Sequence, residues 1–262
     1  LAPKTWKNAT LMATAANMLG LGIGPLLAGF TSQHLQDPLH LIFYVHLALL
    51  LLAAIGVGVI RETVQRPPQL KLAIQKPSVP PSVRGVFISA SIAGLAGFSV
   101  AGLFTSMVPS VLIHIMDVHG GVLIGAVIGL FFVASIIGQA LLQWLPKGLH
   151  MTLGCVGLMA GMICLGLSIA TAQLLLLVGA GLLAGIGQGM ILRAGMGAVT
   201  ASSPPDQKAA VTSAFFVVLY VSISVPVVAV GFSVQAFGLP HVGEFFASLV
   251  AVVALLAMVS MK

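Results

Sequence analysis

The chain alternates long runs of apolar residues with mostly short polar connections. A helix needs about 20 apolar residues to cross the hydrocarbon core of a bilayer, which is roughly 30 Å thick. Eight runs are long enough, namely residues 8–30, 39–60, 86–112, 121–145, 151–170, 173–198, 209–236 and 242–261. The pattern therefore predicts an all-α fold, a polytopic transmembrane bundle of eight spanning helices.

Composition supports a membrane location. Of the 262 residues, 59% are hydrophobic and 6% are charged, whereas a soluble domain carries roughly 25% charged residues. So few charges cannot cover a surface in water, so a lipid bilayer is the expected surrounding. Cys155 and Cys164 lie on opposite sides of one predicted helix and cannot pair with each other, so they do not indicate a redox compartment.

The basic residues give an orientation. If the eight spans alternate in direction, all 11 Lys and Arg residues fall on one side, and the loops 31–38, 114–120, 171–172 and 237–241 on the other side contain none. Positive residues concentrate on the cytoplasmic side of membrane proteins. We therefore expect a plasma (inner) membrane protein with both termini in the cytoplasm. Membrane orientation also accounts for the net charge of +6, so no nucleic-acid partner is expected.

The first span contains the glycine-rich stretch NMLGLGIGPLLAGF at residues 17–30. In lipid, small residues four apart let two helices approach closely. Gly20, Gly24 and Ala28 share one face, and Gly29 lies beside it. Pro25 bends the helix, which a membrane tolerates better than water does. The stretch predicts a kinked spanning helix with a groove for a neighbouring helix.

This stretch carries a family resemblance. The pattern Gly20-x-x-x-Gly24-Pro25-x-x-Ala28-Gly29 resembles the fifth-helix motif G-x-x-x-G-P-x-x-G-G of major facilitator superfamily transporters, in particular the proton-coupled drug antiporter branch. Ala28 departs from the motif by replacing the first glycine of its closing pair. Arg61-Glu62-Thr63 resembles the exit of the family's sixth helix, and the proline-rich basic stretch 61–85 resembles the link between its two halves.

The resemblance implies a fragment that covers family helices five to twelve. Residues 1–60 would be the last two helices of the N-terminal half, residues 61–85 the cytoplasmic linker, and residues 86–262 the complete six-helix C-terminal half. It implies a secondary transporter that exports small amphiphilic molecules in exchange for protons by alternating access. Such a protein is monomeric when complete, needs no cofactor and is not an enzyme.

Other functions remain open from the sequence. One alternative is an uptake permease for a sugar or another metabolite, and a second is a truncated membrane protein that transports nothing. A sugar permease should have a cavity rich in Asn, Gln and Trp, whereas an exporter should have an apolar, aromatic one. Export is favoured by the aromatic residues at membrane depth, Phe98, Phe131, Phe132, Phe216 and Tyr220. A membrane enzyme would need converging His, Asp or Ser residues at one depth, and the sequence shows no such group.

Polar residues at membrane depth are costly and usually face a cavity or a partner. On this basis we expect the substrate cavity to be lined by Asn17, Ser99, Ser106, Phe132, Gln139, Gln188, Tyr220 and Ser224. For the serines the alternative is a hydrogen bond back to a carbonyl of the same helix. Asn17 lines the cavity or bonds to a neighbouring helix.

Two basic residues are candidates for gating or coupling. Arg193, near the cytoplasmic end of the sixth span, either extends to the surface or pairs as part of an inner gate. His46, inside the second span, is either a structural histidine or a proton carrier. No span has Asp or Glu near its middle, so a coupling acid would lie in the first four family helices. His114-x-x-Asp117-x-His119 lacks the spacing of a metalloprotease motif, and no metal site is expected there.

Overall fold

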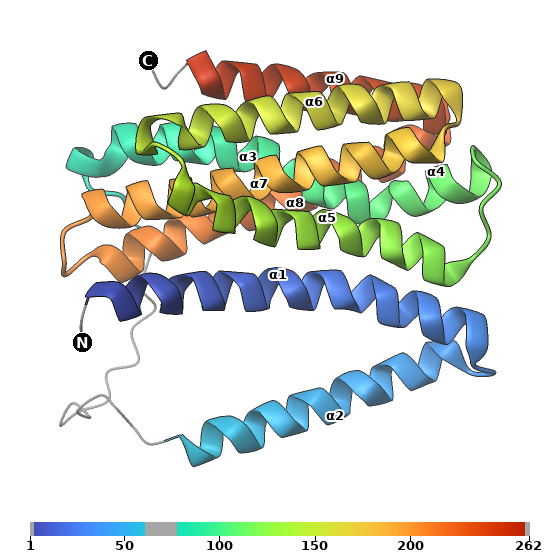
Figure 1. Ribbon diagram of the computed structural model, residues 1–262, viewed down its shortest axis with the longest axis horizontal. Coiled ribbons are helices and arrows are strands. Elements are labelled where there is room, and N and C mark those ends of the chain that lie inside the picture. The colour runs from blue at the N-terminus through green and yellow to red at the C-terminus, as the bar shows by residue number, and fades with distance from the viewer. Residues whose placement is uncertain (1–2, 61–77, 260–262) are drawn as a thin grey trace.

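The computed structural model describes residues 3–60 and 78–259, and Figure 1 shows an elongated bundle of helices. Its elements, in chain order, are α1 (Pro3–His34), α2 (Pro38–Val59), η1 (Pro81–Val83), α3 (Arg84–Ser106), α4 (Val108–His114), α5 (Gly121–Leu141), η2 (Leu142–Trp144), η3 (Lys147–Leu149), α6 (His150–Thr171), α7 (Leu174–Ser202), α8 (Lys208–Phe237) and α9 (Leu239–Val259). The Arg61-Glu62-Thr63 sequence and most of the expected linker lie outside the described residues.

The predicted number of spans is confirmed. Eight helical segments of the described chain are long and apolar enough to cross a membrane. The third segment, Pro81–His114, combines η1, α3 and α4. Its helix is interrupted at Met107, two residues before Pro109, because a proline ring cannot donate the backbone hydrogen bond that a continuous helix requires.

The bundle core is formed by the helices of the C-terminal part of the chain. α6 packs against α7 and α9, α7 also packs against α5 and α3, and α3 packs against α8. Phe104 of α3 and Phe131 of α5 are fully buried, and their rings stack with centroids 4.9 Å apart. α1 joins the bundle through α5, whereas α2 contacts mainly α1 and has no buried residue.

The direction of the helices explains the distribution of charge. The first described residues of α1, the start of α3, the α5–α6 connection, the α7–α8 connection and the end of α9 all lie at the same end of the bundle (Figure 1). Arg84, Lys147 and Lys208 belong to these segments. We call this end the basic end, and the opposite end carries the α1–α2, α4–α5, α6–α7 and α8–α9 connections.

Candidate functional site

Glycine residues bring α1 and α5 into close contact. The carbonyl oxygen of Gly29 lies 2.7 Å from the position that a Cβ atom on Gly121 would occupy. The carbonyl oxygen of Gly22 lies 2.9 Å from the corresponding position at Gly129, and a Cβ atom on Gly125 would meet the carbonyl oxygen of Pro25. No side chain fits at these positions without moving backbone atoms. The α1–α5 seam, defined by these six residues, therefore depends on glycine.

The packing face of α1 differs from the expected one. Gly29 and Pro25 belong to the seam, but no described atom lies within 4 Å of a Cβ atom built on Gly20 or Gly24. No neighbouring helix of the described chain therefore occupies the Gly20–Gly24 face in this structure. The reason is helical phase, because at 100° per residue Gly20 and Gly24 point roughly opposite to Gly22. Ala28 is exposed.

A hydrogen bond closes the seam at the end opposite the basic end. The backbone N–H of Val122 donates to Oε1 of Gln33 over 3.0 Å. Val122 is in the first turn of α5, where backbone N–H groups have no partner within the helix. The Gln33 side chain of α1 thus caps α5 and ties the two helices together.

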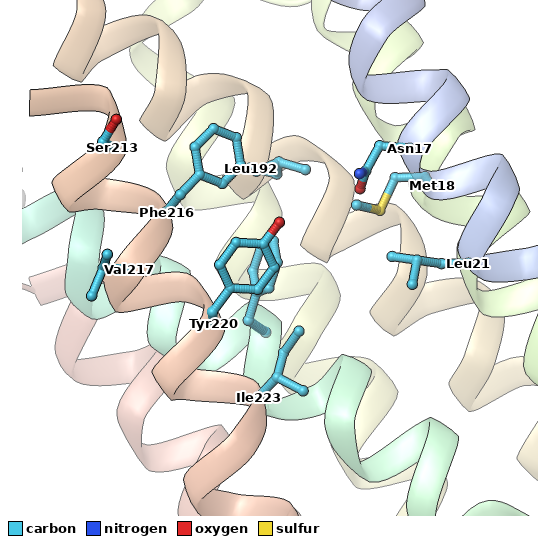
Figure 2. Close-up of a pocket in the computed structure, with 10 residues that line it drawn as sticks. Asn17, Met18, Leu21, Leu192, Ser213, Phe216, Val217, Tyr220 and Ile223 are labelled. Atoms are coloured by element: carbon cyan, nitrogen blue, oxygen red, sulfur yellow. The ribbon is translucent and has the colours of Figure 1, made fainter. Parts of the chain in front are cut away.

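A cavity of about 540 Å³ lies between α1, α3, α7 and α8. It is lined by Asn17, Met18, Leu21, Phe98, Leu192, Ser213, Phe216, Val217, Tyr220 and Ile223. Figure 2 shows the rings of Phe216 and Tyr220 pointing from α8 toward the α1 side chains on the opposite wall. The lining is mainly apolar, and its polar groups are one amide and two hydroxyls.

Only two of the expected cavity residues, Asn17 and Tyr220, line this cavity. Phe132 is buried and packs against Gly22 in α1. Its position in the seam places it away from the cavity lining. Phe98 and Phe216, which were expected to be aromatic residues at membrane depth, are lining residues.

The expected serines bond to backbone carbonyls. Ser106 donates to the carbonyl oxygen of Gly102 over 2.8 Å, and Ser224 donates to that of Tyr220 over 2.9 Å. Both bonds stay within one helix, which is the alternative to cavity lining that was expected for the serines. Ser99 is buried and donates over 3.1 Å to the carbonyl oxygen of Ser222, so it links α3 to α8. None of the three expected serines lines the cavity.

The two expected glutamines lie between α5 and α7 instead. Gln188 is 1% exposed, and its Oε1 accepts a hydrogen bond of 2.5 Å from the Ser135 hydroxyl. Gln139 is 0% exposed, and neither of its amide atoms has a partner among the described residues. Nε2 of Gln188 also has none. These amides are part of the helix packing and do not reach the cavity.

The two candidate gating residues differ in their surroundings. Arg193 of α7 donates a hydrogen bond to the backbone carbonyl of Gln139 in α5. Arg193 is therefore paired with the backbone of a neighbouring helix, and its role in gating stays a prediction. His46 is exposed on α2 and has no hydrogen-bond or ionic partner among the described residues.

A helical bundle with eight described segments long and apolar enough to cross a membrane, and with a mainly apolar cavity between four of its helices, is typical of a membrane transport protein. A family model described as Major Facilitator Superfamily matches residues 1–227, and the chain belongs to this family. Its members are secondary transporters and not enzymes, and this protein is a secondary transporter. No match to a curated protein was found for the chain.

Proposed function

We propose that the protein exports small amphiphilic molecules in exchange for protons. The observation that carries this proposal is the lining of the cavity. Phe98, Phe216 and Tyr220 provide aromatic surface, and the aliphatic residues leave little polar surface for a sugar. Ligand pockets of this kind bind apolar groups and use a few polar groups to fix orientation.

The position of the cavity supports alternating access. Its α8 residues run from Ser213, five residues after Lys208 at the basic end, to Ile223 at the middle of that helix. At the opposite end the α1–α5 seam is closed by glycine packing and by the hydrogen bond from Val122 to Gln33. This arrangement fits a state that is open toward the basic end and sealed at the other.

Proton coupling rests on the resemblance of the glycine-rich stretch of α1 to the antiporter motif. Among the described residues, no Asp or Glu lies near the middle of a spanning helix, and Glu244 lies near the start of α9. A proton-coupled exchanger needs a group whose protonation competes with substrate. We propose that this group lies in the family's first four helices, where the resemblance implies a coupling acid.

The transport test uses the full chain in liposomes. Rhodamine 6G, a cationic dye, acridone, an uncharged one, and radiolabelled glucose are each loaded, and their release is followed with and without an inward proton gradient. We expect the gradient to accelerate release of at least one dye, nigericin to abolish this acceleration, and glucose to stay inside. Movement of glucose without either dye would favour an uptake permease. Movement of none of the three would favour the transport-incompetent alternative.

Two substitutions on one helix link transport to the cavity. Phe216→Ala removes an aromatic ring from the lining, whereas Phe232→Ala removes a ring from a residue that is 74% exposed and lies outside the lining. We expect dye release to fall several-fold in the first variant and to stay unchanged in the second. Equal rates in both variants would show that the cavity is not the transport site.

We also propose that the basic end faces the cytoplasm of a plasma (inner) membrane. Single cysteines are introduced as Lys147→Cys, at the basic end, and His119→Cys, at the other end, in a background without the native cysteines. A membrane-impermeant maleimide added to intact cells should label position 119 and leave position 147 unlabelled. The reverse labelling would overturn the orientation.

A further inference from the structure

The cavity has an aromatic wall on α8. Phe216 and Tyr220 are one helical turn apart, and their rings stack with centroids 6.1 Å apart and planes inclined by 25°. The Tyr220 side of this pair is open, because the residue is 58% exposed. Both rings point toward Asn17, Met18 and Leu21 on α1 (Figure 2). The space between the two helices is thus bounded on one side by a nearly continuous aromatic surface.

The polar groups of the cavity are free to bind a ligand. The amide of Asn17, the hydroxyl of Ser213 and the hydroxyl of Tyr220 have no hydrogen-bond partner among the described residues. Together they provide donors and acceptors from α1 and α8. They can therefore bind either a carbonyl or an N–H group of a ligand.

None of the ten lining residues carries a charge at neutral pH. Arg193 follows the lining residue Leu192 in α7, but its guanidinium donates to the backbone carbonyl of Gln139 in α5. An ion that left water for this cavity would lose its hydration without gaining a counter-ion from the lining. The attraction of a cation to aromatic rings compensates for only part of this loss.

From these observations we propose that the cavity selects an uncharged, planar aromatic molecule. Its ring lies against the Phe216–Tyr220 pair, and its polar group bonds to Asn17 and to the Tyr220 hydroxyl. A cavity of about 540 Å³ is within the size range of pockets for such ligands. This inference rests on the proposed function, because it specifies the class of amphiphile that the transporter carries.

The test compares two fluorescent probes that share a three-ring skeleton. Acridone is uncharged and has one carbonyl and one N–H group, whereas N-methylacridinium is cationic and has neither group. Binding of each to the full chain in lipid nanodiscs is measured by fluorescence polarisation, and empty nanodiscs provide the correction for partition into lipid. We expect acridone to bind at least tenfold more tightly than N-methylacridinium.

Substitutions test the aromatic wall and the hydroxyl separately. Phe216→Ala and Tyr220→Ala should each weaken acridone binding by roughly threefold to tenfold, because each removes one stacking partner. Tyr220→Phe, which keeps the ring and the fold, should weaken it about fivefold through loss of one hydrogen bond. The controls are Phe232→Ala and Tyr44→Phe, two exposed residues outside the lining, and both should bind acridone like the unmodified protein.

Each of these binding results either supports or overturns the inference. Equal or tighter binding of N-methylacridinium would overturn the selection for uncharged ligands. Unchanged acridone binding in Phe216→Ala and Tyr220→Phe would overturn the assigned binding surface. Both failures leave gradient-driven release of rhodamine 6G untouched and are thus distinguishable from failure of the proposed function. Absence of gradient-driven release of either dye, in contrast, would remove the proposed function without altering the binding measurements.

Discussion

Replacing Gly29 with alanine is expected to separate α1 from α5. The added Cβ atom would lie 2.7 Å from the carbonyl carbon of Gly121 and closer still to its oxygen, whereas ordinary van der Waals contact begins at 3.4 Å. Because the obstructing atoms are backbone, the two helices must move apart by about 1 Å. Overpacking costs about 1–3 kcal/mol, and we take about 2–3 kcal/mol here because the obstructing backbone atoms cannot rotate away. The better helix propensity of alanine offsets about 1 kcal/mol, which leaves a net cost of about 1–2 kcal/mol.

The assay is thermal unfolding of the purified protein in detergent, followed by tryptophan fluorescence. For a chain of this size, 1 kcal/mol corresponds to roughly 2–4 °C, so we expect Gly29→Ala to lower the midpoint by about 2–8 °C. Gly24→Ala is the matched control, because no described atom lies within 4 Å of its added Cβ. Its midpoint should stay unchanged or rise slightly. Equal decreases in both variants, or no decrease in Gly29→Ala, would refute the proposed seam.

Two further predictions concern side-chain hydrogen bonds. Gln33→Ala should accelerate hydrogen exchange at the Val122 amide several-fold, because it removes the cap from α5, while Gln36→Ala, which alters an exposed loop residue, should leave that exchange unchanged. Gln188→Leu should leave the unfolding midpoint nearly unchanged, because removal of a buried N–H donor that has no partner among the described residues offsets the loss of the hydrogen bond from Ser135. The same substitution should change acridone affinity by no more than about twofold, although Ser135 loses its hydrogen-bond partner. A tenfold loss of affinity would show that Gln188 belongs to the binding site.

Much of the fold could be predicted from the sequence because a bilayer imposes a simple length requirement. Apolar runs of sufficient length give the number of spans, and the alternation of basic and uncharged loops gives their relative direction. The irregularities were less predictable. The third span was expected to be continuous over residues 86–112, but it is interrupted at Met107. A proline bends some membrane helices and breaks others, depending on whether neighbouring helices supply hydrogen-bond partners for the backbone groups that the proline leaves unpaired.

The candidate site was predictable only in part. Asn17 and Tyr220 are polar residues at membrane depth, and both line the cavity. Gln139 and Gln188 have the same sequence signature but lie between packed helices. The period of a helix shows which residues share a face, but it does not show whether a cavity or another helix covers that face. This second property depends on contacts between distant parts of the chain.

The glycines of α7 illustrate this dependence and indicate where the bundle is rigid. Gly185 faces α5, and a Cβ atom added to it would lie 2.8 Å from Cβ of Ala134. Gly187 faces α6, and a Cβ atom added to it would lie 2.6 Å from the backbone nitrogen of Leu158. α7 is thus in backbone contact with helices on two sides, so α5, α6 and α7 form a layer that resists relative movement. α8 has few buried residues along its length and supplies half of the cavity lining. We therefore expect that changes in cavity shape during transport involve movement of α8 and α1 against this layer.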